Sequence, residues 1–443
     1  MNAWNRREVL ALAGALSIPA LAGCLGSLGN GGSGVTPGLL ASDLSRDMDP
    51  EVSTDTLRDQ VRANTQFALD LHHNRVAEKP AENLFLSPLS ISLAMAMVWA
   101  GARGDTEAQI AETLHYVSDQ EDLHPTFNRL DLALDAPDDA EDEAFRLDLV
   151  NALWGQTDYP IDGDYLDTIA RNYGAGLRTL DFAAEPEAAR ETINSWVADQ
   201  TEDRIEELLP QDSITDLTRL VGTNAVYFKA KWAQTFPEES TSNGAFTAID
   251  GTESEVPLMR HSDVSVPYAA VDGAQAIELP YEGDTASMVV VLPPEGEFEA
   301  YEQALDADGL HALFDALEEN DGRVVLPRFT FGTKVGLNQA LKDLGMPDAF
   351  DHDLADFSGL VEPGTPERLA IDDVQHESFV AVDESGTEAT AATGVVVGDE
   401  SAPMNPFEFV ADRPFLFAIR HRETDSVVFL GRVVDAAAAQ SAQ

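Results

Sequence analysis

The chain has 443 residues, and its 79 Asp and Glu against 27 Lys and Arg give a formal net charge of −52. This excess of acid excludes nucleic-acid binding through neutralised phosphates. A hydrophobic fraction of 44% is normal for a folded protein and argues against disorder. We therefore expect a folded chain of the halophilic type, whose acidic surface suits concentrated salt because salt screens the charge repulsion.

Residues 1–23 have the pattern of an export signal. Arg6-Arg7 precede a short apolar run, and a twin-arginine pair at this place indicates export of an already folded protein. The run ends in Leu21-Ala22-Gly23-Cys24, which resembles a lipobox. Cys24 is the only cysteine, so no intrachain disulfide can form. We expect lipid attachment at Cys24, a Gly/Ser-rich flexible tether over 24–55, and a protein anchored to the outer face of the cell membrane.

Helical periodicity is concentrated in the first half of the chain. The segment 89–100 is apolar nearly all round, which is typical of a helix buried in the protein. An acidic loop follows at 135–143. The segments with helical spacing are Arg58–His73, Leu89–Ala100, Asp105–His115, Ala188–Thr201 and Lys334–Leu344, the last closed by Gly345.

Strand-like patterns predominate from residue 220 onward. The expected strands are Leu220–Phe228, Ala276–Leu279, Ser287–Leu292, Arg323–Phe331, Phe379–Val382, Pro414–Arg420 and Val427–Val433. Because helices cluster early and strands late, with no linker that divides the core, we expect a single α+β domain over 56–436. Residues 437–443 are expected to form a disordered tail.

The segment 383–397 resembles a strand that has no partner. Side chains alternate between the two faces of a strand, so every second residue shares one side. From Thr387 that side is small or β-branched and uncharged, and it consists of Thr387, Ala389, Ala391, Thr393, Val395 and Val397. A segment of this pattern could be buried in a sheet.

Motifs of common enzymes are missing from the sequence. A G-x-G-x-x-G match at Gly29, Gly31 and Gly34 lies in the predicted tether, without the strand and helix that such a motif needs. The sequence has no G-x-S-x-G, no P-loop and no H-E-x-x-H. We therefore expect no catalytic site, no metal and no cofactor.

From roughly Asp59 to Asp435 the chain resembles the serpin family of serine protease inhibitors. Any one matching block is weak, but their order and spacing together are specific. The blocks are Asn83-Leu84-Phe85-Leu86-Ser87-Pro88-Leu89-Ser90, Gly101-Ala102-Arg103-Gly104-Asp105-Thr106, Asn224-Ala225-Val226-Tyr227-Phe228-Lys229-Ala230-Lys231-Trp232, Leu279-Pro280-Tyr281-Glu282-Gly283, Leu326-Pro327-Arg328-Phe329, Leu344-Gly345-Met346 with Ala349-Phe350, Ala355-Asp356-Phe357-Ser358-Gly359, Arg413-Pro414-Phe415-Leu416-Phe417 and Phe429-Leu430-Gly431-Arg432-Val433.

The resemblance implies a fold of about nine helices and three β-sheets with a large central sheet and an exposed reactive loop at about 384–410. It also implies a mechanism. A serine protease cuts the loop, the acyl-enzyme forms, and the loop inserts into the central sheet while the protease is still attached. The implied partner is the target protease, in a covalent complex with a monomer of this chain.

The family pattern also assigns residues to roles. It implies a shutter beneath the central sheet made by Ser87, Ser90, Asn224 and His376, and a breach at Trp232, where the loop enters. Gly386 is expected at the hinge for its freedom of backbone conformation. The implied hinge residues are Glu384, Gly386, Thr387, Glu388, Ala389, Thr390, Ala391 and Ala392.

The position of the cleaved bond is open between two counts. The usual family distance from Gly386 favours Glu400-Ser401, and counting back from Pro414-Phe415 by the commonest spacing lands near Pro403-Met404. Glu400-Ser401 is preferred because a bond preceded by Pro403 is a poor protease site, and Met404-Asn405 is the alternative. No Lys or Arg lies between Phe379 and Arg413, so a subtilisin-like or Glu-accepting protease is expected rather than a trypsin-like one.

Two other function classes remain as alternatives. The first is a non-inhibitory serpin that acts as a binding or carrier module. The second is an exported solute-binding lipoprotein, which shares the N-terminal signal and the acidic surface but does not explain the matching blocks.

Overall fold

The computed structural model describes residues 35–134, 145–365, 369–387 and 406–440. Nine α-helices lie within them: α2 (Thr54–Glu78), α3 (Pro88–Trp99), α4 (Gly104–Thr113), α5 (Gln120–Leu134), α6 (Gly163–Tyr173), α7 (Pro186–Gln200), α8 (Phe298–Ala304), α9 (Ala307–Asp315) and α10 (Asn338–Leu344). The mixed α+β class and the helix number agree with the expectation from the sequence.

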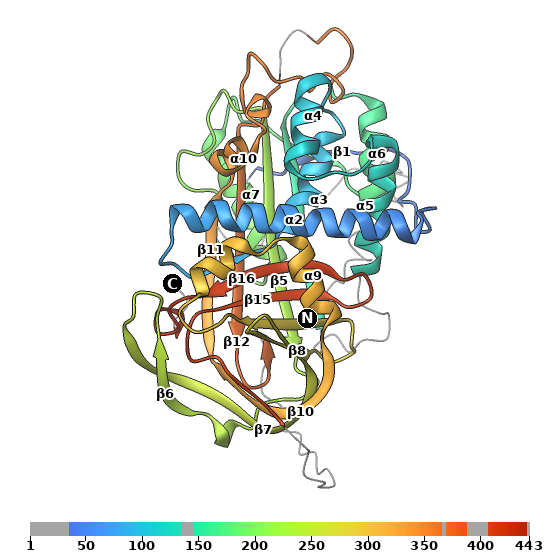
Figure 1. Cartoon of the computed structure of the whole chain (residues 1–443). Helices are drawn as coiled ribbons and strands as arrows, with labels where there is room; N and C mark the ends of the chain where they lie inside the picture. Colours follow the sequence, from blue (N-terminus) through green and yellow to red (C-terminus); the bar gives the residue numbers. More distant parts are fainter. Residues whose placement is uncertain (1–34, 135–144, 366–368, 388–405, 441–443) are drawn as a thin grey trace, which may run out of the picture.

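A seven-stranded sheet forms the centre of the molecule, and its strands run vertically in Figure 1. Their order is β1-β4-β3-β5-β13-β12-β11. The members are β1 (Gly38–Leu40), β3 (Phe145–Gln156), β4 (Leu177–Leu180), β5 (Leu220–Lys231), β11 (Phe329–Gly336), β12 (Asp373–Val382) and β13 (Gly386–Thr387).

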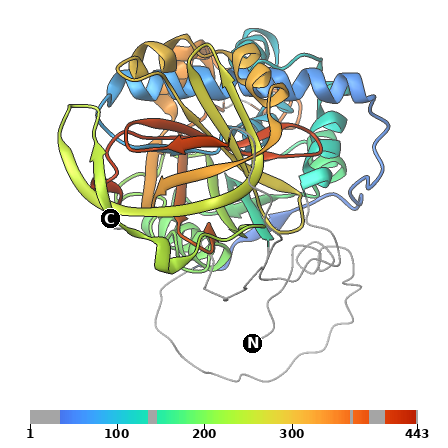
Figure 2. The ribbon, with the colours of Figure 1, turned by 60° about the horizontal axis from the view of Figure 1, so that its bottom comes forward.

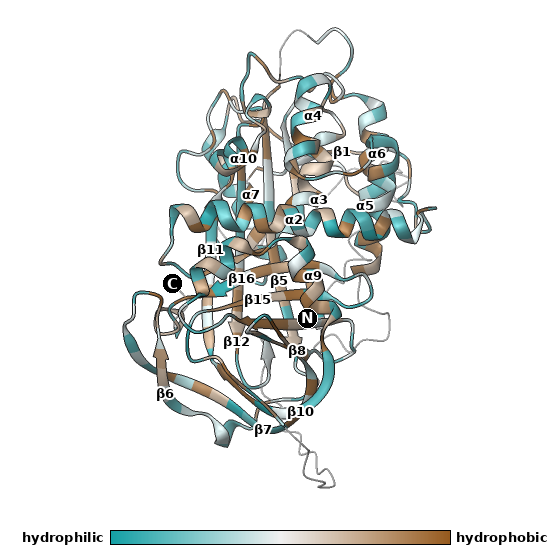
Figure 3. Cartoon of the chain, in the orientation of Figure 1, coloured by the Kyte–Doolittle hydropathy of each residue, from teal (hydrophilic) through white to brown (hydrophobic). Residues whose placement is uncertain are grey.

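A nine-stranded sheet packs across it, and its strands β15 and β16 cross in front of β5 and β12 in Figure 1. The members are β2 (Leu84–Leu86), β6 (Ser242–Thr247), β7 (Glu253–Val271), β8 (Ala274–Pro280), β9 (Ala286–Leu292), β10 (Glu318–Pro327), β14 (Phe407–Val410), β15 (Phe415–His421) and β16 (Ser426–Val433). Apolar residues line β15 and β16, whereas α2 and α4 carry many hydrophilic ones (Figure 3).

The expectation of three sheets differs from the hydrogen bonding, which joins the described strands into two. The reason is β7, a long bent strand seen at the near end in Figure 2. Its first part pairs with β6, its middle with β10 and its last residues with β8. One continuous strand thus connects what would otherwise be two sheets.

Most predicted elements are confirmed, with two errors around β11. The predicted strand 323–331 is two strands of different sheets, because the chain breaks pairing at Arg328 between β10 and β11. The predicted helix 334–344 begins only at Asn338, since Lys334 still pairs with Glu377 of β12. Acidic residues 135–143 lie outside the described part.

The predicted tether over 24–55 is wrong for residues 35–55, which pack on the body. Gly38 pairs with Thr179, so β1 extends the central sheet at its β4 edge. Arg46 forms a 2.7 Å ion pair with Asp131, and both side chains are less than a tenth exposed. The helix α2 then begins at Thr54, with Ser53 as its N-cap. These contacts are non-local, and the polar, Gly-bearing sequence gave no sign of them.

The predicted disordered tail is also wrong for residues 437–440. Ala438–Gln440 form a 3-10 turn in which Ala439 is fully buried. Gln440 donates a 2.7 Å hydrogen bond to the backbone oxygen of Arg328. Within the described residues, no helix combines the length and hydropathy needed to cross a bilayer.

Candidate functional site

The candidate site is the line along which β5 and β12 lie beside each other, the β5–β12 seam. At one end the two strands pair directly and in parallel, from Asp373 opposite Val221 to Ser378 opposite Val226. At the other end β13 lies between them. Thr387 is opposite both Val382 of β12 and Ala230 of β5, in antiparallel pairing. The segment that looked like a strand without a partner therefore already has two residues in the sheet.

A tight turn leads from β12 back into β13. Asp383 accepts hydrogen bonds from the backbone N–H groups of Ser385 and Gly386 at 2.8 and 3.2 Å. Burial raises the pKa of Asp383, although these hydrogen bonds oppose the shift. Trp232, the residue after β5, holds the turn with two hydrogen bonds of 2.9 Å. Its backbone N–H donates to the backbone oxygen of Ser385, and its indole N–H donates to the backbone oxygen of Asp383.

At this turn the Glu384 carboxylate is buried and paired with the guanidinium of Arg328. Its carboxylate accepts hydrogen bonds from Arg328 at 2.6 and 2.7 Å and from the Thr241 hydroxyl at 2.6 Å. Burial would raise the pKa of Glu384, but the hydrogen bonds from Arg328 and Thr241 outweigh it and hold the pKa below its usual value. The side chain is only 6% exposed, so the pair holds the turn in place while the carboxylate is charged.

Gly386 is required for a reason other than the predicted one. Its φ is not positive. A Cβ at this position would instead lie 2.1 Å from the backbone oxygen of Ala230, so no side chain fits. Glycine allows β13 to enter because the two backbones approach closely.

Thr387 is fully buried and points at an aromatic pair. Its hydroxyl lies 2.8 Å from the Tyr281 hydroxyl. The Tyr281 ring stacks on Trp232 with centroids 4.6 Å apart and an 8° angle between the planes. Trp232, which the family resemblance assigns to the breach, therefore lies one side chain away from Thr387.

The four residues assigned to the shutter lie together under the closed end of the seam. The backbone N–H of Ser87 donates to His376 Nε2 at 3.2 Å, so the proton is on Nδ1, which donates to the Asn224 side-chain oxygen. The Asn224 amide donates to Ser90 Oγ at 2.7 Å and to Asn151. Burial lowers the pKa of His376 to about 3, so the ring is neutral.

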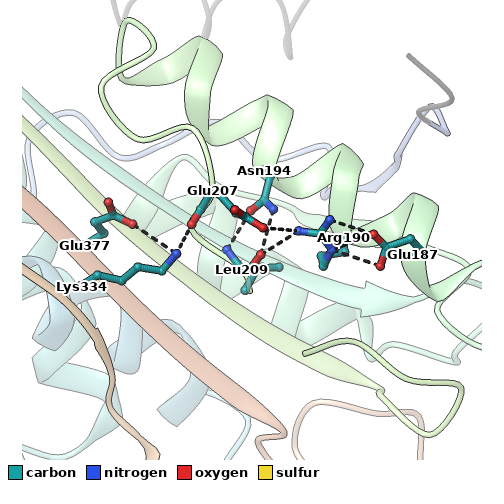
Figure 4. A network of polar contacts seen from close by, with 7 residues as sticks. All are labelled: Glu187, Arg190, Asn194, Glu207, Leu209, Lys334 and Glu377. Carbon is teal, nitrogen blue, oxygen red and sulfur yellow. Dashed lines mark hydrogen bonds and ion pairs between the residues drawn. The ribbon is translucent and has the colours of Figure 1, made fainter. Parts of the chain in front are cut away.

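The face of the central sheet opposite α3 is covered by α7 and by the loop between α7 and β5, residues 201–219, called here the α7–β5 loop. Arg190 on α7 binds Glu187, Glu207 and the backbone oxygen of Leu209, and Asn194 exchanges two hydrogen bonds with Leu209 (Figure 4). These contacts hold the start of the loop against the helix.

The same loop reaches strands on both sides of the seam. Glu202 pairs with Arg146 of β3 on one side. On the other, Lys334 of β11 donates to the Glu207 backbone oxygen and lies 3.9 Å from Glu377 of β12 (Figure 4). Burial raises the pKa of Glu377, and Lys334 opposes the shift. A strand added to the seam would move the two sides apart by about 4.8 Å, so these contacts cannot all persist.

Several predicted residues lie outside the described part of the chain. They are Cys24, Glu388, Ala389, Thr390, Ala391, Ala392, Glu400, Ser401, Met404 and Asn405. Sequence reasoning gave no role to Arg328, Thr241, Tyr281, Asn151 or Lys334. Arg328 and Tyr281 stand inside the matching blocks, which was the available signal. In the described residues no three His, Cys, Asp or Glu side chains are grouped as a metal site would need.

The site is thus a mixed sheet that already holds the first two residues of its own downstream segment, Gly386 and Thr387, between β5 and β12. The family model described as "Serpin (serine protease inhibitor)" matches residues 62–436. The chain belongs to the serpin family, whose members are typically protease inhibitors rather than catalysts.

Individual relatives support the same assignment. An uncharacterized serpin-like protein of Thermococcus kodakarensis is 38% identical over 94% of this chain and 96% of its own length. The leukocyte elastase inhibitor of Bos taurus is 39% identical over 84% of this chain and 98% of its own. Among solved structures, the thermophilic serpin tengpin in its native state has a TM-score of 0.79 at 28% identity, covering 90% of this chain and all of tengpin. Human thyroxine-binding globulin in complex with its hormone has a TM-score of 0.76 at 28% identity, over 86% and 99% of the two chains.

Proposed function

We propose that the chain inhibits serine proteases as a suicide substrate. The observation that carries the proposal is the position of β13, whose Gly386 and Thr387 already lie between β5 and β12. After cleavage, the residues that follow Thr387 are free to continue this strand. Each added residue forms backbone hydrogen bonds to strands on both sides, and the attached protease is distorted before the acyl bond is hydrolysed.

The composition of the loop supports insertion. The residues that alternate from Thr387 to Val397 are small or β-branched and carry no charge or proline. The first of them, Thr387, is fully buried in the uncleaved structure. A buried charge or proline at these places would oppose strand formation.

The target we propose is an extracellular subtilisin-like protease of the same saline surroundings. The expected cleavage is at Glu400-Ser401, with Met404-Asn405 as the alternative. Mixing the protein with a halophilic subtilisin in molar salt should give a covalent complex that survives SDS. Mass measurement of the released fragment would locate the cut.

A matched control is Thr387→Arg. Thr387 has no exposed surface, so a charged arginine cannot be buried there without a large cost. This variant should be cleaved at the same bond but form no SDS-resistant complex. Clean cleavage of the unmodified protein, with no complex at any ratio, would overturn the inhibitory function.

We also propose export and anchoring through lipidated Cys24, as a monomer on the outer face of the cell membrane. The twin-arginine pair and the Leu-Ala-Gly-Cys sequence support this part. Replacing Cys24 by alanine should release the protein into the medium, and a membrane-bound Cys24→Ala variant would contradict it. The halophilic character is tested by thermal melting, which should show a more stable fold at molar salt than at low salt.

A carrier function without inhibition is the second candidate, favoured by the relative whose structure holds thyroxine. The two functions differ in what cleavage does. Insertion raises the melting temperature of the cleaved protein, whereas a carrier with no insertion shows no rise. One melting experiment before and after loop cleavage therefore separates them.

A further inference from the structure

The first residues that the structure describes are bound tightly along one edge of the central sheet. Val35 exchanges two hydrogen bonds with the Thr192 hydroxyl of α7, at 3.1 and 3.2 Å. A Cβ on Gly38 would lie 2.4 Å from the Thr179 hydroxyl oxygen, so β1 packs against β4 at a distance that no side chain would allow. The segment 35–49 is thus a fixed part of the folded body.

This fixed segment nevertheless holds apolar side chains in solvent. In the described residues, seven large apolar side chains are exposed by more than a third, and four of them fall within residues 39–48, which we call the apolar segment. The four are Leu39, Leu40, Leu44 and Met48, exposed by 55, 36, 41 and 65%. Single exposed apolar residues are ordinary on a protein surface, whereas a concentration of them marks a surface that meets an apolar partner.

The place where the described chain begins indicates which partner this is. Cys24, the expected site of lipid attachment, stands eleven residues before Val35. Eleven residues span at most about 40 Å, whereas a folded body of this size is about 55 Å across. A lipid inserted at Cys24 therefore keeps the edge of the sheet that carries β1 close to the bilayer.

An apolar contact would add to the binding that the lipid provides. One lipid chain alone gives marginal, reversible binding, and the usual addition is a group of basic residues that attracts anionic lipids. A chain with a net charge of −52 has no such attraction to offer. Apolar side chains can supply binding without cations, because their transfer from water to the membrane interface depends on area and not on charge.

We propose that the apolar segment is the surface that lies on the membrane, with its four exposed side chains entering the boundary between headgroups and acyl chains. The inference rests on the proposed anchoring, because without a lipid at Cys24 nothing selects a bilayer as the partner. It goes further by naming the side chains that touch the bilayer and the edge of the sheet that faces it.

The register of the sheet shows that this contact leaves the breach free. Gly38 pairs with Thr179, which pairs in turn with Gly155 of β3. Gly155 pairs with Leu220, so β1 lies in line with the start of β5. The strand β13 pairs with Ala230, ten residues farther along β5, which is about 33 Å. In Figure 1 β1 lies toward the upper end of the sheet, and β7 and β10 lie at the opposite end. A protease can therefore reach the breach end of the anchored protein.

The test uses Cys24→Ala, in which the apolar segment is the only expected membrane contact. At excess lipid this variant should bind weakly and reversibly to vesicles of equal parts phosphatidylcholine and phosphatidylglycerol, measured by co-sedimentation. Such binding is too weak to retain the variant on cells in dilute medium. Adding Leu44→Asp and Met48→Asp should lower the partition coefficient by about tenfold or more, because two apolar side chains are lost and two charges gained. Both positions are exposed, so the melting temperature should stay the same.

The matched control adds Val117→Asp and Leu354→Asp to Cys24→Ala. These two side chains are exposed by 51 and 59%, so the pair removes similar apolar surface and adds the same charge elsewhere. It should change the partition coefficient by less than about twofold. Salt gives a second readout, because raising it from about 0.1 to about 2 M screens the repulsion from the anionic lipid. Binding through the apolar segment should therefore rise with salt, whereas binding through basic residues would fall.

The contact can also be located directly, because Cys24→Ala leaves the chain without any cysteine. Met48→Cys in this background, labelled with an environment-sensitive fluorophore, should shift its emission to the blue on the same vesicles. Leu354→Cys with the same label should show no shift.

The outcomes separate the surface from the anchor. Equal partition with and without Leu44→Asp and Met48→Asp, or an equal fall in the control pair, would overturn the assignment of the apolar segment. So would a Cys24→Ala protein that does not bind vesicles, or one that forms a dimer in solution which the two substitutions convert to a monomer. The anchor is judged on cells: if the unmodified protein is released as freely as Cys24→Ala, the lipid anchor is disproved and the membrane surface fails with it.

Discussion

The two ends of the β5–β12 seam are held in different ways. At the breach end, β13 fills the seam, and a charged pair of Glu384 with Arg328 and an aromatic stack of Tyr281 on Trp232 surround it. At the shutter end, β5 and β12 pair directly above a neutral hydrogen-bonded network centred on Asn224. At the breach end β13 separates β5 from β12, and at the shutter end β5 and β12 are hydrogen-bonded to each other.

The difference shows which contacts insertion must break. At the breach end Gly386 and Thr387 are already paired, so continuing β13 there would need little further rearrangement. At the shutter end, six parallel residue pairs from Asp373 to Ser378 have to separate, together with the bond between His376 and Asn224. For the insertion that we propose, the barrier would therefore lie at the shutter and the starting position at the breach.

The largest effect is expected from closing the breach with Gly386→Val. The added carbon would lie 2.1 Å from a backbone oxygen, so β13 must leave the seam. The second-order rate constant of inhibition should fall by at least about a hundredfold. Gly163→Val, at the exposed start of α6 where a Cβ meets nothing within 4 Å, is the control. Equal rates for both variants would mean that entry at β13 is not needed.

Removing the centre of the shutter should have the next largest effect. Asn224→Ala leaves the buried His376 Nδ1–H without its acceptor. It also removes one hydrogen bond each from Ser90 and Asn151, which still bond each other. The free energy of unfolding should fall by about 2–4 kcal/mol, measured by denaturant titration at fixed salt. Asn320→Ala, on the exposed part of β10, should change it by less than about 0.5 kcal/mol. A similar loss in both variants would contradict the comparison of the two ends.

Acid should weaken the shutter end before the breach end. The pKa of His376 is about 3 in the fold, below the value of about 6.5 for an exposed histidine, so the unfolded chain takes up the proton first. Its contribution to stability is complete above pH ~6.5 and is lost as the pH falls from there toward ~3, by about 1.4 kcal/mol per pH unit. The lowered pKa of Glu384 means that its own contribution is lost only below about pH 4.5, as the pH falls through its folded value.

Other buried histidines, such as His124, also have a lowered pKa, so the measurement is a difference. Denaturant titrations of the unmodified protein and of His376→Gln between pH 7 and 5 should show a smaller loss of stability in the variant, by about 2 kcal/mol. Parallel curves would show that His376 does not carry this pH dependence.

The smallest effect should come from the α7–β5 loop. Lys334→Gln removes the contact between Glu207 of the loop and β11, which lies on the β12 side of the seam. Arg146→Gln removes the contact between Glu202 of the loop and β3, which lies on the β5 side. These are partly exposed contacts, so loop insertion should quicken by only about two- to fivefold in Lys334→Gln. Arg146→Gln and the conservative Lys334→Arg should match the unmodified protein. The rate is followed by stopped-flow tryptophan fluorescence after mixing with protease; the chain has five tryptophans, and Trp232 is the one beside β13. Equal acceleration by both glutamine variants would show that the contact across the seam does not limit insertion.

The sequence predicted much of the fold because strand and helix periodicities are local. Strands β5, β9 and β16 and the buried helix α3 were found within a few residues of their ends. The errors occurred where contacts with residues far away in the sequence determine the local structure. Arg328 splits one apolar run into two strands because it turns to Glu384. Residues 35–49 are held by contacts with β4, α5, α6 and α7, all distant in the sequence.

The candidate site was predictable to a similar degree. Ser87, Ser90, Asn224 and His376 were assigned from the family resemblance, and they lie within one hydrogen-bonded network. Asn151 was missed because nothing in its local sequence marks it, and Arg328 and Tyr281 were missed although they stand inside blocks that match the family. Each is recognisable only from the group it contacts across the fold.

By itself, the sequence determined the acidic charge and the small alternating residues after Glu384, since these depend on composition and period alone. Only the tertiary structure decided that β13 occupies the seam as far as Thr387, that the seam is closed between Asp373 and Ser378, and that Gly222 lies over a cavity. The physical reason is that strand register and packing space arise between segments far apart in the chain, where no local pattern specifies them.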